Sequence, residues 1–254
     1  MTDLMSPSIK EHLWHKMRLD LTKFIPALAS SQVLMCCCCG RFLAQEFFDL
    51  EHLIPRQVLK EDPPTVRNDP STPGNVRSGN LLLCKKPLMY KGSKLYNNGC
   101  NSWKGRFYDK SISDILAGRI DASHQTNRKL QNAHIIGGLM LAYLAMVAEY
   151  GYVITLMQSG LLLREQFFRP HHFHPKLGTR HQIILAGAPF KEADTQVWSN
   201  PFKFKFEHGA CFVTIRNFVV IAPVSRDPSV PIAQHLRIVP ERFKFRPNFN
   251  TSLA

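Results

Sequence analysis

A run of four cysteines at positions 36–39, followed by Cys84 and Cys100, constrains this chain more than any other feature. Within the run, only Cys36 and Cys39 have the Cys-x-x-Cys spacing that lets two thiolates bind one metal ion, at Zn–S distances of about 2.3 Å. Cys84 and Cys100 would complete a structural zinc site. The register within the run stays open, because the two cysteines between the expected ligands have no assigned role.

Residues 85–99 separate the last two cysteines and are rich in Lys, Tyr, Gly and Asn, which predicts a surface loop that leaves the metal and returns to it. Its lysines would neutralise phosphates and its tyrosines would stack on exposed bases. A solvated loop is the alternative interpretation. The candidate nucleic-acid-binding residues in this insert are Lys85, Lys86, Lys91 and Lys94.

The chain has a formal net charge of +13, and an excess of this size favours polyanionic partners. We therefore expect DNA as the partner, with RNA not excluded and a solvated basic surface as the alternative. Asp3, Lys10 and Glu11 lie where a signal peptide would need an apolar segment. This predicts a reducing, cytoplasmic location, in which the seven cysteines are thiols or metal ligands.

The first half of the sequence predicts a helix at 3–24 and then the order strand, loop, strand, helix. Residues 47–54 and 81–83 are the expected strands. Residues 60–79, with four prolines, predict a loop between them. Residues 101–116 predict the final helix, with its apolar side chains on one side.

An apolar segment at 135–157 is long enough to resemble a membrane span. Glu149 would be costly at the centre of a span. We therefore expect a buried helix at 135–148, a turn at Gly151 and no membrane association. A protein anchored in a membrane by this segment is the alternative hypothesis.

The last part of the chain predicts short strands. They are expected at 182–185, 202–206, 211–215, 218–222 and 242–246, and the histidines at 171, 172 and 174 are expected in a surface loop. We predict an α+β fold with three parts: an N-terminal helix at 1–30, a nuclease module at 31–118, and an accessory domain at 119–254. The accessory domain would hold a helical segment and a small, mainly β part.

Four motifs occur in order between the cysteines. They are Cys-x-x-Cys-Gly from Cys36, Glu-His-x-x-Pro from Glu51, Asn-Leu-x-x-Cys from Asn80, and Cys-Asn-x-x-Lys-Gly from Cys100. In combination they resemble the HNH endonucleases, whose fold is the ββα-metal module with zinc-knuckle cysteines. The resemblance covers residues 36–109. The chain departs from the family pattern in the insert before Cys100 and in the proline-rich segment before Asn80.

The resemblance implies a metal-dependent endonuclease that hydrolyses phosphodiester bonds in DNA. His52 would be the general base, since an imidazole has an unperturbed pKa of about 6.5. Asn80 would orient that imidazole through a hydrogen bond. Glu51 and Asn101 would be oxygen ligands of the catalytic ion, Mg²⁺ or Mn²⁺.

Lys104 and Arg56 would hold phosphate oxygens in the same site. A zinc-knuckle protein that binds nucleic acid without catalysis is the alternative function, and the intact Glu-His pair argues against it. Cutting both strands with one site per chain would favour a homodimer.

Overall fold

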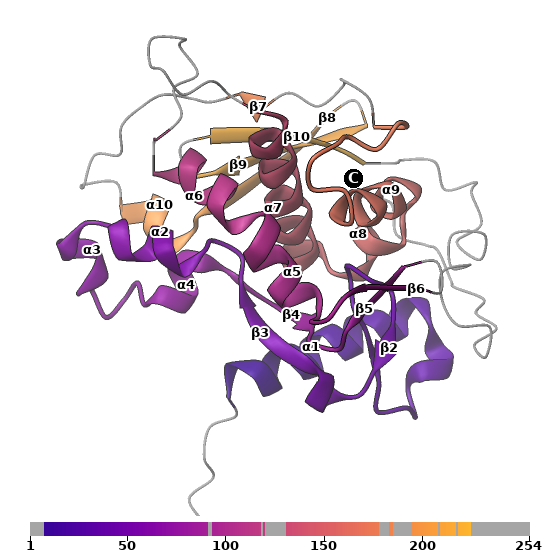
Figure 1. The fold of residues 1–254 in the computed structure, drawn as a ribbon. Coiled ribbons are helices and arrows are strands. Elements are labelled where there is room, and N and C mark those ends of the chain that lie inside the picture. Colours follow the sequence, from indigo (N-terminus) through magenta and orange to yellow (C-terminus); the bar gives the residue numbers. More distant parts are fainter. Residues whose placement is uncertain are drawn as a thin grey trace, which may run out of the picture.

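The computed structural model describes residues 8–90, 93–117, 119, 131–177, 183–184, 195–207, 209–216 and 218–224. Helices and small antiparallel sheets are mixed along the chain, which confirms the α+β class (Figure 1). The predicted strand at 242–246 lies outside the described residues.

The first half of the chain builds three small strand pairs surrounded by helices. In chain order its elements are α1 (Ile9–Phe24), η1 (Pro26–Leu28), β1 (Leu34–Met35), β2 (Phe42–Leu43), η2 (Gln45–Phe47), β3 (Phe48–His52), α2 (Arg56–Glu61), α3 (Pro64–Arg67), α4 (Gly74–Ser78), β4 (Asn80–Cys84), β5 (Leu88–Tyr90), β6 (Ser93–Tyr96), α5 (Cys100–Phe107) and α6 (Asp109–Leu116). β1 pairs with β2, β3 with β4 and β5 with β6, all antiparallel. The two strands predicted between the cysteines are confirmed as β3 and β4.

In its described residues, the second half adds four helices and a four-stranded sheet. Its elements are α7 (Asn132–Tyr150), α8 (Tyr152–Leu156), α9 (Gln158–Phe167), β7 (Ile183–Ile184), α10 (Thr195–Ser199), β8 (Phe202–Glu207), β9 (Ala210–Ile215) and β10 (Phe218–Pro223). The strand order is β7-β10-β9-β8, and all pairs are antiparallel. The predicted strand at 202–206 and the predicted hairpin of 211–215 with 218–222 are confirmed.

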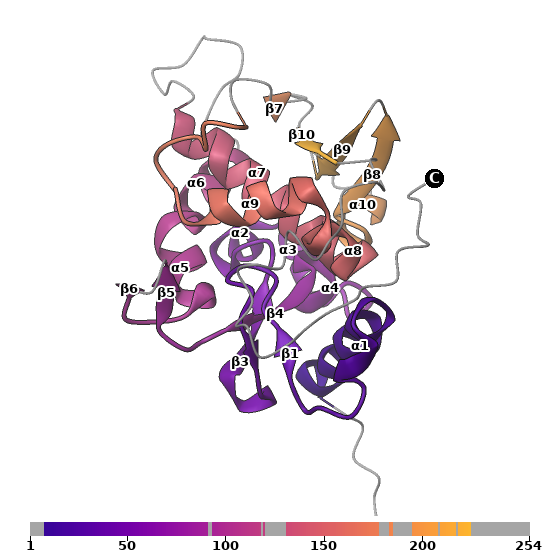
Figure 2. The ribbon, with the colours of Figure 1, turned by 90° about the vertical axis from the view of Figure 1, so that its right-hand side faces the viewer.

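Helix α7 is the central helix, and it packs against α6, α8, α9 and β10 (Figures 1 and 2). It is the one helix among the described residues that is long and apolar enough to cross a membrane, and most of its side chains are buried inside the fold. The helix ends at Gly151, whose φ of +77° favours glycine. The predicted buried helix and turn are therefore confirmed. One core runs without a break from α1 through α7 to β10.

The predicted loop at 60–79 is wrong, because this segment contains the end of α2 and all of α3 and α4. Pro63 and Pro64 occupy the start of α3, and Pro73 precedes α4. Proline fits the first turn of a helix, where its missing N–H would have no intrahelical partner. The predicted helix at 101–116 is divided at Tyr108, where α5 ends and α6 begins.

The histidine-rich segment is only partly a surface loop. His171 and His172 are exposed, as expected. His174 is buried, and its Nε2 lies 2.6 Å from Oε2 of Glu165. This histidine therefore holds the chain against the end of α9.

A buried ion cluster joins the α2–α4 segment to the four-stranded sheet. Asp62 lies between two arginines: its Oδ2 is 2.5 Å from Nη1 of Arg77, and its Oδ1 is 2.7 Å from Nη1 of Arg216. All three residues are buried. The guanidinium of Arg216 also lies 4.9 Å from the ring centre of Trp198 in α10.

We expect Asp62→Ala to lower the free energy of unfolding by about 3–5 kcal/mol, because it leaves two buried guanidiniums without their counter-ion. Asp69→Ala is the matched control, since the bonds of its carboxylate to other described residues lie within its own turn, to Ser71 and Thr72. Urea denaturation of both variants measures the difference. Equal unfolding midpoints would show that this cluster does not hold the segment to the sheet.

Candidate metal centre and active-site pocket

The four cysteines predicted to bind zinc converge on one point. The Sγ atoms of Cys36, Cys39, Cys84 and Cys100 all lie within 4.8 Å of one another, and all four residues are buried. The sulfurs of Cys36 and Cys100 are 3.7 Å apart. The Sγ atom of Cys84 lies 3.5 Å from the Sγ atom of Cys39 and 3.5 Å from that of Cys100. A tetrahedral zinc site with Zn–S bonds of about 2.3 Å needs sulfurs about 3.8 Å apart, so the four thiols fit this ion.

The turn between β1 and β2 presents Cys36 and Cys39, the two cysteines of the run whose sulfurs belong to the four-cysteine cluster. The N–H of Cys36 donates to the carbonyl of Arg41 at 2.9 Å, and the N–H of Gly40 donates to the carbonyl of Cys36 at 2.8 Å. Gly40 has a φ of +72°, and a Cβ there would lie 1.8 Å from a guanidinium nitrogen of Arg164. Glycine is therefore required at this turn.

The other two cysteines meet because β4 ends against the start of α5. Cys84 is the last residue of β4 and Cys100 the first of α5. Gly99 lies between this helix and the strand, and a Cβ on it would lie 2.1 Å from the carbonyl oxygen of Cys84. The insert between these two cysteines, predicted as a loop that leaves the metal and returns, contains the β5–β6 hairpin.

The two middle cysteines of the run are also buried, and their backbone carbonyls accept hydrogen bonds from the core helices. The carbonyl of Cys37 accepts a 2.7 Å hydrogen bond from the hydroxyl of Tyr143. The carbonyl of Cys38 accepts one from Nε of Arg164 at 3.3 Å. These bonds attach the knuckle to α7 and α9, so the run serves both the metal centre and the core.

Arg41 places a positive charge beside the cysteine cluster. Its Nε lies 3.4 Å from Sγ of Cys39, and its Nη2 lies 3.4 Å from Sγ of Cys84. Burial alone would lower the pKa of Arg41, but the neighbouring sulfurs raise it above its usual range. Such a cation offsets the negative charge of four thiolates around a divalent ion.

A separate pocket of about 620 Å³ opens beside β3, and four of the residues predicted for the active site line it. Glu51, His52, Arg56 and Asn101 all line it, as does Asp109. They come from β3, from the start of α2, from α5 and from the start of α6. The pocket has room for an ion and a phosphate between an imidazole, an amide and carboxylates.

His52 is the last residue of β3 and pairs directly with Asn80, the first residue of β4. Direct cross-strand partners place their side chains on the same face of the sheet. The hydrogen bond of the imidazole joins its Nδ1 to Oγ of Ser78, at 3.0 Å. Burial and the charge of Arg56 lower the pKa of His52, which favours the neutral imidazole that a general base requires.

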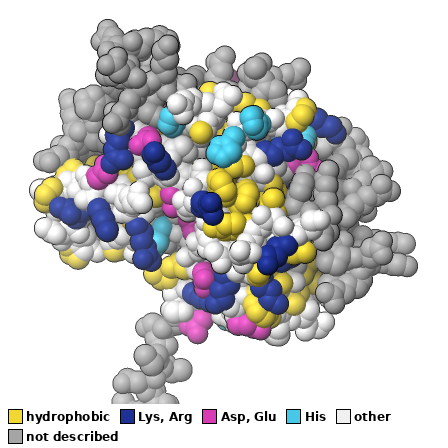
Figure 3. All heavy atoms as spheres, in the orientation of Figure 1, with side chains coloured by type: hydrophobic (Ala, Val, Ile, Leu, Met, Phe, Trp, Pro, Cys, Tyr) yellow, Lys and Arg dark blue, Asp and Glu magenta, His cyan; other side chains and the backbone are white. Residues whose placement is uncertain are grey.

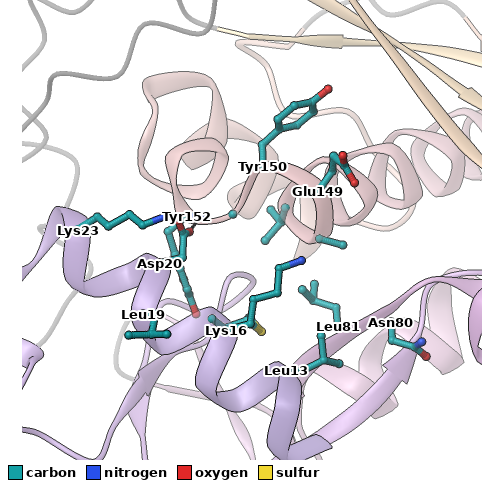
Figure 4. Close-up of a pocket in the computed structure, with 14 residues that line it drawn as sticks. Leu13, Lys16, Leu19, Asp20, Lys23, Asn80, Leu81, Glu149, Tyr150 and Tyr152 are labelled. Atoms are coloured by element: carbon teal, nitrogen blue, oxygen red, sulfur yellow. Dashed lines mark hydrogen bonds and ion pairs between the residues drawn. The ribbon is translucent and has the colours of Figure 1, made fainter. Parts of the chain in front are cut away.

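Asn80 also borders a second cavity, which His52 does not line. Its Nδ2 donates to the carbonyl of Asn75 at 2.8 Å, and its Oδ1 is buried. The side chain borders a cavity of about 360 Å³ between α1 and the turn from α7 to α8, shown in Figure 4. Ser78 thus bonds to the imidazole at Nδ1, and the side chain of Asn80 also acts on the imidazole of His52, whose pKa it raises by hydrogen bonding.

Lys104 lies beneath the pocket and is 1% exposed. Its Nζ lies 2.6 Å from Oε1 of Glu51, 2.7 Å from Oδ1 of Asp109, and 3.2 Å from the carbonyl oxygen of His52. These three contacts use all three of its N–H donors. Instead of a phosphate contact, Lys104 supports the two carboxylates from inside the protein.

Charge and burial act in opposite directions on this ion pair. Burial raises the pKa of Glu51, and the charge of Lys104 partly offsets that effect. For Lys104, burial would lower the pKa, but Glu51 and Asp109 together raise it. The ammonium therefore stays charged and favours the ionised carboxylate, which a metal ligand must be.

Asn101 is the second residue of α5, and its side chain points back toward β3. Its Nδ2 donates to the carbonyl of Leu50 at 3.4 Å. Gly99 is the N-cap of α5, so Asn101 does not have the capping role that asparagine often takes. Because the amide nitrogen contacts the strand, the oxygen Oδ1 is the atom left for a metal ion.

The predicted nucleic-acid-binding lysines of the insert differ in their contacts, and Lys85 pairs with a residue that lines the pocket. Nζ of Lys85 pairs with Asp49 at 3.5 Å, and the ammonium of Lys86 lies 3.5 Å from the ring centre of Phe47. Lys94 is exposed on β6. Lys91 lies outside the described residues.

Three residues at these sites were not predicted from the sequence: Arg41, Ser78 and Asp109. Ser78 could have been found by extending the strand register, since the N–H of Ile54 donates to its carbonyl at 3.0 Å. Asp109 follows the final helix motif and carries no motif signal of its own. Arg41 directly follows the Cys-x-x-Cys-Gly motif, where a basic residue is also compatible with a solvated surface.

Comparison with known proteins returned no match: no family model fits the chain, and no curated protein or solved structure is significantly similar to it. The class of protein that fold and site define is therefore an α+β protein with a buried four-cysteine cluster that could hold a metal ion such as zinc.

Proposed function

We propose that this protein is a metal-dependent endonuclease of the HNH type that hydrolyses phosphodiester bonds in DNA. The observation that carries the proposal is the shared pocket, where Glu51 and His52 from the end of β3 meet Asn101 from the start of α5. The antiparallel β3–β4 pair followed by α5 has the strand–strand–helix order of the ββα-metal module. The cysteine cluster joins the end of β4 to the start of α5 and so supports the same arrangement.

Each residue has a definite part in the proposed reaction. His52, held through Nδ1 by Ser78, accepts a proton from the attacking water at Nε2. Glu51 and Asn101 hold Mg²⁺ or Mn²⁺, which supplies charge neutralisation at the phosphate and the leaving oxygen. Arg56 binds a phosphate oxygen at the rim. Lys104 keeps Glu51 ionised from beneath.

One observation favours a second candidate, a zinc-knuckle protein that binds nucleic acid without cutting it. Lys104 already neutralises Glu51 and Asp109. A pocket whose carboxylates are satisfied by an ammonium needs no divalent ion for its stability. The ion pair involves only Oε1 of Glu51, however, and a carboxylate can bind a metal ion through its other oxygen.

The expected setting of the reaction is part of the proposal. DNA is the substrate, the location is cytoplasmic, and no membrane is involved. The net charge of +13 supports binding to a polyanion. Cleavage of both strands with one site per chain requires two chains. We therefore propose that the protein acts on DNA as a homodimer.

Supercoiled plasmid tests the proposal most simply. We expect the protein to nick or linearise the plasmid in Mg²⁺ or Mn²⁺ and to leave it intact in EDTA. The reason is that the divalent ion stabilises the negative charge that develops on the phosphate in the transition state. Excess Mg²⁺ should restore cleavage to EDTA-treated protein that elemental analysis shows to have kept its zinc; this separates the catalytic ion from the structural one. Binding of DNA without cleavage under any of these ions would favour the second candidate, and preferential cleavage of an RNA transcript would change the substrate.

A further inference from the structure

A second groove opens beside the active-site pocket, and the two share His52 and Arg56. This groove has a volume of about 360 Å³ and is lined by residues of α2, α3 and α4. These are the helices of the proline-rich segment that departs from the HNH pattern. Because residues are shared, a molecule bound in the active-site pocket can continue into the groove without leaving the surface.

The groove is basic at its rim. Arg56, Lys60 and Arg67 line it together with the apolar Leu59 and with Gly74, and no acidic residue is among its lining. All three cations are exposed. Figure 3 shows Lys and Arg side chains gathered over α2 and α3, next to a histidine. The sign of this charge fits a polyanion.

The acidic residues nearest in sequence are occupied elsewhere. Glu61 pairs with Arg119. Asp62 is buried between two arginines, one of which is Arg216 from the end of β9. Asp69 is bonded within its own turn. The positive charge of the groove is therefore not neutralised by its neighbours in the segment.

We infer that this groove is a subsite for the DNA strand on one side of the cleaved bond. Arg67 and Lys60 bind phosphates next to the scissile one, Arg56 lies between the two pockets, and the apolar floor at Leu59 contacts a sugar. The inference rests on the proposed function, since it places the scissile phosphate at His52. Phosphate contacts of this kind fix the register of a strand without reading its sequence.

The test measures binding of a fluorescently labelled DNA duplex by anisotropy as a function of salt, with Ca²⁺ in place of Mg²⁺. We expect Arg67→Ala and Lys60→Ala each to weaken binding about fivefold. Each should also reduce the slope of log affinity against log salt by about 0.9, the loss of one phosphate contact. Lys203→Ala is the matched control, because Lys203 is an exposed lysine on β8, outside both pockets, and its loss changes the net charge equally.

A pair of glycine variants tests occupancy without changing charge. A Cβ at Gly74 would lie 3.9 Å from Leu59 and from Arg77, an ordinary contact, so Gly74→Ala should bind DNA like the wild type. Gly74→Phe fills the groove and should weaken binding at least fivefold, equivalent to about 1 kcal/mol at 25 °C.

The outcomes separate this inference from the proposed function. If the wild type cleaves plasmid but the Arg67 and Lys60 variants match Lys203→Ala in affinity and salt slope, the groove is not a subsite. If the wild type neither binds nor cleaves DNA, the proposed function fails and the subsite fails with it. The thermal unfolding midpoint of each variant must match that of the wild type. Weaker binding can then be attributed to the altered groove and not to unfolding.

Discussion

Cys84→Ala will prevent stable folding of the first half of the chain, and removal of zinc from the wild type will have the same effect. The four sulfurs come from the β1–β2 turn, the end of β4 and the start of α5. Each of these elements is short, so we expect a zinc ion bound by the four cysteines to supply much of the free energy that holds them together. Structural zinc in small domains contributes about 10 kcal/mol or more.

Cys211→Ala is the matched control for this prediction. Cys211 is a buried cysteine on β9, outside the cluster, so its truncation removes a thiol from the core without touching the metal centre. Elemental analysis should find one zinc ion per chain in the wild type and in Cys211→Ala, and none in Cys84→Ala. A wild-type protein that purifies without metal and unfolds at the same urea concentration as Cys84→Ala would contradict the zinc site.

The same assay tests the register of the cysteine run. Cys39→Ala should lose zinc, whereas Cys37→Ala should retain it, because only the first of these sulfurs belongs to the cluster. Cys37 contributes its carbonyl to Tyr143, and an alanine keeps that carbonyl.

His52→Ala will lower the rate of plasmid cleavage by about 10²–10⁴-fold, the usual contribution of a positioned general base. The variant should still bind DNA in Ca²⁺, because the phosphate-binding residues remain. His12→Ala is the control, since His12 is an exposed histidine on α1 and does not line the pocket. Equal rates for wild type and His52→Ala would remove His52 from the mechanism.

Short-range patterns predicted much of the fold correctly. Alternation in the strand at 202–206 and the apolar helix at 135–148 are properties of neighbouring residues, and both are confirmed. The order of the motifs predicted that Glu51, His52 and Asn101 converge. The structure brings these positions together because β3 pairs with β4 and because β4 ends against α5.

Other features depend on contacts that no local pattern contains. The prolines at 63, 64 and 73 indicated a loop, yet proline also occurs in the first turn of helices. The buried ion pair of Asp62 with Arg216 stabilises the helical conformation of this segment. Lys104 resembled a phosphate ligand, but its position one turn into α5 directs it under the pocket. Both outcomes are decided by tertiary packing.

The most direct test is anomalous diffraction from crystals soaked in Mn²⁺, with data collected at the manganese and zinc edges. We predict a manganese peak in the pocket, bound by Glu51 and Asn101 and facing His52, together with a zinc peak among the four cysteines as an internal reference. A zinc peak without manganese between Glu51 and Asn101 would contradict a catalytic ion at this site and favour a protein that binds nucleic acid without cutting it.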